Sequence, residues 1–284
     1  MSAKILDGKW VRDQILADLR PRVEKLAARR PPGLAVVLVG HDPGSEIYVR
    51  NKVKACADLG IYSEKITPED TISTGDLLGI VEGLNQRREI DGILVQMPLP
   101  KHIDSRRILL AIHPGKDVDG FHPTNLGNLV VGIPGPRACT PAGIMELLRR
   151  YEIGVEGKNA VVVGRSDIVG KPMALLLLHQ NATVTICHSK TRDLAGECRR
   201  ADILVAAMGR PAFIQADAIQ PGATVIDVGM NRLPEGKVIG DVDPEAVRAK
   251  AGAFTPVPGG VGPLTVAMLM TNTVAAAERN LCSA

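Results

Sequence analysis

A tyrosine and a lysine stand four residues apart in the first quarter of the chain. Tyr48 and Lys52 fall within residues 43–59, where Asp42 is a suitable N-cap and a proline suits the first helical position. Residues four apart lie on one face of a helix. A lysine that is desolvated in a cleft can act as a base near neutral pH, so the pair is a candidate for proton transfer. A surface lysine whose stem packs on the tyrosine ring would give the same pattern.

A second group of polar residues follows an apolar run at residues 90–96. Gln96 ends that run, and Asp117 and Asp119 lie in the loop at 116–123. In open α/β sheets the loops beyond the strand ends build the ligand site, and loop residues often carry function. The pattern predicts a site that contains Gln96 and the loop with Asp117 and Asp119, although Asp-Gly is also an ordinary turn pair.

A glycine-rich turn joins a predicted strand at 159–164 to a predicted helix. Gly164 and Gly170 allow a tight turn and a close approach of the backbone to a pyrophosphate, next to the helix N-terminus. The spacing is G-x-S-x-x-x-G, with Arg165 and Ser166 inside it, rather than G-x-G-x-x-G. The strand and helix on either side favour a dinucleotide site, and a plain strand–turn–helix is the alternative.

The end of the next strand indicates which dinucleotide would bind. Sites for NAD carry an acidic residue about 20 residues after the glycines, to hold the ribose hydroxyls. Residues 187–191 (Cys-His-Ser-Lys-Thr) contain no acid. Ser189, with Arg165, suits the additional phosphate of NADP, whereas solvated loop residues would be the alternative interpretation.

Two further segments are expected beside the cofactor. Met230 follows the strand at 224–229, so it should face the nicotinamide half of the cofactor; core packing is its alternative role. The strap at residues 256–263 contains Pro258, Gly259 and Gly260 and connects the second domain to the last helix. It is expected at the cleft.

The elements that must position these residues are typical of an α/β protein. Long apolar runs that end in glycine indicate strands buried on both faces, as in a parallel sheet, and alternating helices imply right-handed crossovers. We expect an N-terminal α/β domain (1–138 plus 264–284), completed by the C-terminal helix, and a Rossmann-type NADP-binding domain (139–263), with the active-site cleft between them. The Gly- and Pro-rich residues 114–141 are predicted to connect the domains, and Pro21 to kink or break the first helix.

Composition excludes several functional classes. A length of 284 residues suggests about two domains, and a net charge of +3 with only seven aromatic rings argues against nucleic-acid binding. Five cysteines without a CxxC pair argue against a zinc site or a disulfide framework. No metal-binding histidine pattern, G-x-S-x-G elbow or P-loop occurs. The uncharged stretch at 251–277 is too broken by proline to span a membrane, so we expect a cytoplasmic protein without a membrane partner.

Six motifs resemble those of one family, the bifunctional methylenetetrahydrofolate dehydrogenase/cyclohydrolases, in the same order through nearly the whole chain. The most specific are the Lys-Asp-Val-Asp-Gly segment and the last strap. The matching stretches are Tyr48-Val-x-x-Lys52-x-Lys54, Asp91-Gly-Ile-Leu-Val-Gln96-Met-Pro-Leu-Pro100, Lys116-Asp-Val-Asp-Gly-Phe-His-Pro123, Cys139-Thr-Pro141, Gly164-Arg-Ser-x-x-Val-Gly170-x-Pro172 and Thr255-Pro-Val-Pro-Gly-Gly-Val-Gly-Pro263.

The resemblance implies two reactions at one site. Hydride leaves methylenetetrahydrofolate for NADP⁺, and water then opens the methenyl cation to formyltetrahydrofolate. By the same resemblance, Lys52 is the key group for hydrolysis with help from Gln96, Tyr48 stacks on the folate, and Asp119 anchors the pterin. The strap residues Pro258, Gly259 and Gly260 are expected to bind substrate.

The resemblance also implies the residues that hold NADP, a homodimer and a place in one-carbon metabolism and purine biosynthesis. The cofactor-binding residues are Gly164, Arg165, Ser166, Gly170, Ser189 and Met230, with Met230 where the family commonly has isoleucine. Two alternatives stay open. One is another two-domain NADP-dependent dehydrogenase of the shikimate dehydrogenase type, and the other is an inactive dinucleotide-binding module.

Overall fold

A computed structural model describes residues 3–282 and divides the chain into two compact units. The six-stranded unit contains the chain up to Asp13 together with Thr140–Thr265, and the three-stranded unit contains Gln14–Cys139 and the chain from Val266 onward. The division differs from the sequence-based boundaries at the N-terminus. The short strand β1 (Lys4–Ile5) pairs in parallel with β11 (Ala253–Phe254), so the first residues belong to the six-stranded unit.

The sheet of the six-stranded unit has the strand order β1-β11-β8-β7-β5-β6, and every neighbouring pair is parallel. The chain runs from β5 to β6 on one side and then to β7 on the other, which creates a topological switch point beside β5. Ligands of open α/β sheets bind at such a point, outside the carboxyl ends of the strands. The other strands are β5 (Asn159–Val163), β6 (Thr183–Cys187), β7 (Ile203–Ala206) and β8 (Thr224–Asp227).

Aliphatic side chains form the core of this unit. All four residues of β7 and four of the five in β5 are buried, as expected for central strands of a parallel sheet. The helix α7 packs on β5 and β6. The helices and short ribbon of the unit are α6 (Cys139–Arg150), α7 (Gly170–His179), α8 (Leu194–Cys198), η2 (Ala216–Ala218), β9 (Asn231–Arg232), β10 (Val238–Ile239) and α9 (Pro244–Lys250).

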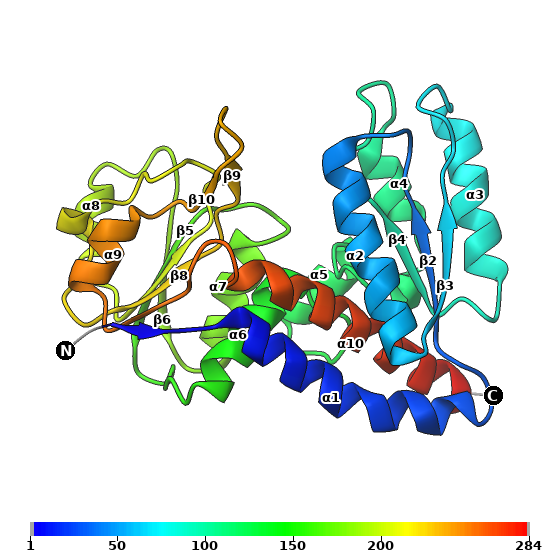
Figure 1. Ribbon diagram of the computed structural model, residues 1–284, viewed down its shortest axis with the longest axis horizontal. Coiled ribbons are helices and arrows are strands. Elements are labelled where there is room, and N and C mark those ends of the chain that lie inside the picture. Colours follow the sequence, from blue (N-terminus) through cyan, green and yellow to red (C-terminus); the bar gives the residue numbers. More distant parts are fainter. Residues whose placement is uncertain (1–2, 283–284) are drawn as a thin grey trace. The chain divides into compact units, whose positions relative to one another are not determined.

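The three-stranded unit has a parallel sheet in the order β3-β2-β4. Figure 1 shows this sheet flanked by α2 and α3. The strands are β2 (Gly33–Val37), β3 (Tyr62–Ile66) and β4 (Gly92–Val95); the helices are α2 (Pro43–Leu59), α3 (Thr74–Gln86), α4 (Ser105–Ala111), η1 (Pro114–Lys116) and α5 (Pro123–Val130). The long helices α1 (Gly8–Ala27) and α10 (Val261–Cys282) each begin in the six-stranded unit and continue in this one.

The α/β class with parallel sheets is confirmed, and the structure corrects three local predictions. The stretch 114–141, predicted as a connection, contains η1 and α5. Pro21 lies inside α1 and does not end it. The Thr140–Pro141 pair also predicts Thr140 as a helix N-cap, but Thr140 lies in the first turn of α6, because that helix begins at Cys139. Within residues 3–282, no helix has the length and apolar character required to cross a bilayer.

Candidate active site

The lysine of the Tyr48–Lys52 pair lies buried in the three-stranded unit. Its helix α2 begins where the Asp42 side chain accepts a hydrogen bond from the Ser45 N–H at 2.7 Å. Lys52 is 9% exposed, and its Nζ donates to Gln96 Oε1 at 3.0 Å. The Gln96 Nε2 donates to the Met97 carbonyl at 2.7 Å, which fixes the amide with its oxygen toward the lysine. The structure therefore holds a buried amine against the residue that follows β4.

Tyr48 lies one turn before Lys52 on α2 and is 49% exposed. This arrangement excludes the alternative in which a surface lysine rests on a tyrosine, because the lysine is buried and bonded to Gln96. An exposed aromatic ring beside a buried amine is available for a planar ligand.

Asp119 lies close to the same lysine, in the loop between η1 and α5. The pKa of Asp119 is raised to about 6, mainly by burial; the positive charge of Lys52 lowers it and the charge of Asp117 raises it. The structure thus brings Lys52, Gln96 and Asp119 together within one unit. A carboxylate with this pKa is mostly ionised at neutral pH and can accept hydrogen bonds from N–H groups of a ligand.

The neighbouring Asp117 shapes the loop that carries Asp119. It is buried, and its carboxylate accepts from the Gly120 N–H at 3.1 Å, the His122 N–H at 2.8 Å and the Asn125 Nδ2 at 2.9 Å. All of these bonds are internal to the loop and the start of α5. Asp117 is therefore a structural residue, and Asp119 is the carboxylate left to meet a ligand.

Asn272, which was not predicted from the sequence, supports the same loop from α10. Its Nδ2 donates to the carbonyl oxygens of Val118 at 2.8 Å and Arg137 at 3.0 Å. Cys139 Sγ also donates to the Val118 carbonyl, at 3.3 Å, and burial raises the pKa of that thiol well above its ordinary value. Its only signal in the sequence is an asparagine among the mostly apolar residues of α10.

In the six-stranded unit, the turn between β5 and α7 requires both of its glycines. Gly164 has φ +138°, and a Cβ at this position would overlap the carbonyl oxygen of Ala207. A Cβ on Gly170 would overlap the carbonyl of Gly164, so the start of α7 lies directly against the turn. These are the roles that glycines take in dinucleotide-binding turns: a tight turn and close packing of helix on strand.

Polar groups surround this turn. Ser166 Oγ accepts from the N–H groups of Val169 at 3.2 Å and Gly170 at 3.3 Å, and Arg165 is exposed. Ser189 is exposed in the turn after β6, the strand next to β5. Because neighbouring parallel strands end at the same edge of a sheet, Arg165 and Ser189 share that edge.

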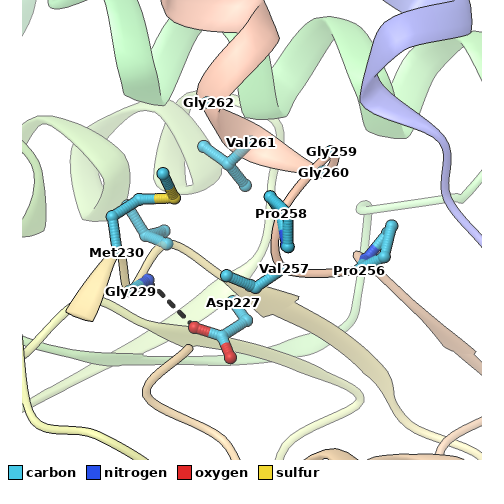
Figure 2. A pocket seen from close by; sticks show the side chains of 11 residues that line it. Asp227, Gly229, Met230, Pro256, Val257, Pro258, Gly259, Gly260, Val261 and Gly262 are labelled. Carbon is cyan, nitrogen blue, oxygen red and sulfur yellow. Dashed lines mark hydrogen bonds between the residues drawn. The ribbon is translucent and has the colours of Figure 1, made fainter. Parts of the chain in front are cut away.

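The strap and Met230 line one small hollow. Figure 2 shows residues 227–230 on one side of it and residues 256–262 on the other. Met230 is 46% exposed, so the core-packing alternative is wrong for this side chain. Gly259 has φ +106°, which favours glycine, and its carbonyl accepts from the Gly8 N–H at 3.0 Å. The strap is thus anchored to the start of α1.

No cluster of three or more potential metal ligands occurs within residues 3–282. The site residues comprise a buried amine–amide pair with a carboxylate in one unit, and a glycine turn, an exposed arginine and two exposed serines in the other.

Comparison with family models gives two matches. Residues 138–281 match the model described as "Tetrahydrofolate dehydrogenase/cyclohydrolase, NAD(P)-binding domain". Residues 6–119 match the model of the catalytic domain of the same family. The first match contains the glycine turn and the strap, and the second contains Lys52, Gln96 and Asp119.

Relatives and solved structures agree with these models. The "Bifunctional protein FolD" of Solibacter usitatus is 64% identical over 97% of this chain and 98% of its own. The crystal structure of the bifunctional FolD enzyme from Campylobacter jejuni has a TM-score of 0.95 and 46% identity, covering 98% of this chain and 99% of that one. The Trypanosoma brucei enzyme, solved with NADP cofactor and inhibitor, has a TM-score of 0.94 and 38% identity, covering 99% of both chains.

Shikimate dehydrogenases resemble the chain far less. The Thermus thermophilus enzyme is 15% identical with a TM-score of 0.50, covering 87% of this chain and 99% of its own. Identity at this level shows a related fold alone.

Proposed function

Because the chain belongs to the tetrahydrofolate dehydrogenase/cyclohydrolase family, we propose that it oxidises 5,10-methylenetetrahydrofolate with NADP⁺ and then hydrolyses the methenyl product to 10-formyltetrahydrofolate. The observation that carries the proposal is the buried Lys52–Gln96 pair beside Asp119, within residues that match the catalytic-domain model. The match of residues 138–281 to the NAD(P)-binding domain model supports the use of a dinucleotide cofactor.

The residues around the β5–α7 turn fit a dinucleotide. The absence of a Cβ on Gly164 and Gly170 lets the turn pack against Ala207 and the start of α7, and the α7 N-terminus adds the positive end of a helix dipole. Arg165 and Ser189 stand at the sheet edge where the 2′-phosphate of NADP would need a cation and a hydrogen-bond donor. When bound, NADP⁺ supplies the acceptor for the hydride that leaves the methylene group.

The hydrolysis depends on the three-stranded unit. Water attacks the carbon of the methenyl group, and Lys52 Nζ accepts the proton that this water releases. Gln96 Oε1 accepts a hydrogen bond from the amine and holds it in position. Because Lys52 is buried, its stem is fixed and little freedom is lost when the substrate binds.

Substrate binding uses the exposed ring and the partly buried carboxylate of the same unit. Asp119 accepts N–H groups of the pterin, and Tyr48 stacks on the ring system. Pro258, Gly259 and Gly260 contact the substrate through an apolar ring and backbone atoms of the strap. The cleft expected between the two domains stays a prediction.

The proposal is tested by Lys52→Met, which retains the length of the side chain and removes the amine. We expect cyclohydrolase activity to fall by ~10²-fold or more, which is the contribution typical of a positioned acid–base group. Lys65→Met is the matched control, because Lys65 is an exposed lysine of β3 in the same unit and its loss leaves activity unchanged. Near-normal formyl product from Lys52→Met would refute the assigned role.

The two alternatives are separated by simple assays. A shikimate dehydrogenase would reduce NADP⁺ with shikimate and not with methylenetetrahydrofolate. An inactive dinucleotide-binding module would bind NADP⁺ without turnover, whereas Lys52, Gln96 and Asp119 are all present.

The cellular setting belongs to the same proposal. The enzyme works as a homodimer in the cytoplasm and supplies one-carbon units for purine biosynthesis. The dimer rests on the family resemblance and is checked by sedimentation. Four described cysteines, at positions 56, 139, 187 and 198, are free thiols, as is usual in a reducing compartment.

A further inference from the structure

One buried carboxylate holds the loops that follow β7 and β8. Asp241 is fully buried. Its Oδ2 accepts from the N–H groups of Met208 at 2.7 Å and Gly209 at 2.9 Å. Its Oδ1 accepts from the Arg210 N–H at 2.9 Å and the Asn231 Nδ2 at 2.8 Å. A single side chain therefore joins residues 208–210 to the segment after β8.

A second buried carboxylate completes this arrangement. Asp227 ends β8 and accepts from the N–H groups of Gly229 at 2.9 Å, Asp241 at 2.8 Å and Val242 at 3.0 Å. The Asp227 N–H in turn donates to Thr255 Oγ1 at 2.8 Å, at the start of the strap. Figure 2 shows Asp227 with its bond to Gly229, on the wall of the hollow that Met230 and the strap line.

Glycine backbone packs directly against both carboxylates. A Cβ on Gly229 would overlap the Asp241 backbone and carboxylate, and a Cβ on Gly240 would overlap the Asp227 carboxylate. Each carboxylate is therefore surrounded by backbone, and N–H donors satisfy its oxygens.

These loops stand where the nicotinamide half of a dinucleotide belongs. They follow β7 and β8 at the carboxyl ends of the strands, beyond the switch point that holds the glycine turn. Hydride transfer depends on the alignment of two carbon atoms, and an error of about 1 Å can cost ~10²-fold in rate. Hydrolysis of the methenyl substrate needs no hydride acceptor.

We propose that Asp241 is a positioning residue for hydride transfer, which sets the loops after β7 and β8 and is dispensable for the cyclohydrolase reaction. This inference rests on the proposed function. The ratio of dehydrogenase to cyclohydrolase activity, measured on one protein preparation, therefore tests this inference.

The test is Asp241→Asn, which keeps the shape of the side chain and places an NH₂ group against backbone N–H donors. We expect dehydrogenase kcat/KM for NADP⁺ to fall about 10- to 100-fold, as for loss of a hydrogen bond to a charged group. Cyclohydrolase activity on methenyltetrahydrofolate stays within about twofold of wild type, since Lys52 and Gln96 lie in the three-stranded unit and the Asp241 carboxylate bonds to residues 208–210 and 231 rather than to the strap. Wild type is assayed first, because absence of its dehydrogenase activity would refute the proposed function itself.

Two further variants make the result decisive. Asp243→Asn removes a charge two residues away, at the N-cap of α9, where asparagine caps equally well, so both activities stay near wild type. Asn231→Ala removes one donor to Asp241 and is expected to lower the dehydrogenase alone, by about 3- to 10-fold. If Asp241→Asn yields no folded protein, the effect of Asn231→Ala on the two activities tests the proposal in its place. Equal losses in both activities, or an unchanged dehydrogenase, would overturn the assignment.

Discussion

Replacing Gly164 by alanine tests the architecture of the nucleotide site directly. Gly164 adopts φ +138° immediately after β5, and its N–H donates to the Cys187 carbonyl at 2.9 Å, which ties the turn to β6. An added Cβ would overlap the carbonyl oxygen of Ala207 and lie 3.0 Å from its carbonyl carbon. Because the clashing atoms are backbone, no side chain can move aside to relieve the contact.

The expected cost has two parts. An L-residue held in this backbone region costs about 1–3 kcal/mol, and adding a methyl group to a tightly packed site costs a further ~1–3 kcal/mol. Together they lower the free energy of unfolding of the six-stranded unit by about 2–6 kcal/mol. In a domain of this size the melting temperature changes by about 2–4 °C per kcal/mol, so a decrease of at least ~4 °C follows.

Calorimetry and NADP⁺ titration measure the two consequences of this change. The variant should melt earlier than wild type and bind NADP⁺ at least ~10-fold more weakly, since the Cβ displaces the turn that carries the phosphate-binding backbone. Gly83→Ala is the control, because Gly83 is an exposed glycine of α3 with no atom near its Cβ position, and alanine there stabilises by about 0.4–1 kcal/mol. A Gly164→Ala protein with wild-type melting and NADP⁺ affinity would refute the reasoning.

Three more predictions follow from the site. Since Asp119 has a pKa of about 6, its carboxylate becomes protonated as the pH falls, and the dissociation constant for tetrahydrofolate should rise about 10-fold between pH 7 and pH 5. Titration calorimetry on Asp119→Asn should show no such pH dependence. Tyr48→Ala should raise the KM for methylenetetrahydrofolate ~10-fold while Tyr48→Phe stays within about 3-fold, and equal effects would argue against stacking. Arg165→Ala and Ser189→Ala should each raise the KM for NADP⁺ about 10-fold and leave that for NAD⁺ unchanged; a parallel change would contradict 2′-phosphate recognition.

Elements with strong local signals could be predicted from the sequence. The bounds of α2 were predicted to the residue, because Asp42 suits its N-cap and a proline its first position; in the structure, Gly60 adopts the left-handed conformation that ends it. The buried strands β5 and β7 appeared as unbroken aliphatic runs. In the same way, the spacing of Tyr48 and Lys52 and the position of Gln96 at a strand end were visible in the printed residues.

What the sequence did not reveal depends on partners distant in the chain. β3 was missed because it is a polar edge strand without a buried pattern, and β1 exists only because β11 pairs with it. Asp241 and Asn272 carry no motif, and their roles follow from backbone groups brought to them by the fold. Propensity and periodicity describe local structure, whereas these residues depend on tertiary contacts.

The most direct test of the central claim is to mix the purified protein with 5,10-methylenetetrahydrofolate and NADP⁺ and to record absorbance. The proposed function predicts that NADPH appears, together with a methenyl band that then decays as formyltetrahydrofolate forms. In Lys52→Met the methenyl band should persist. No NADPH from the wild-type protein would contradict the proposed function, and a methenyl band that never decays in wild type would remove the second activity.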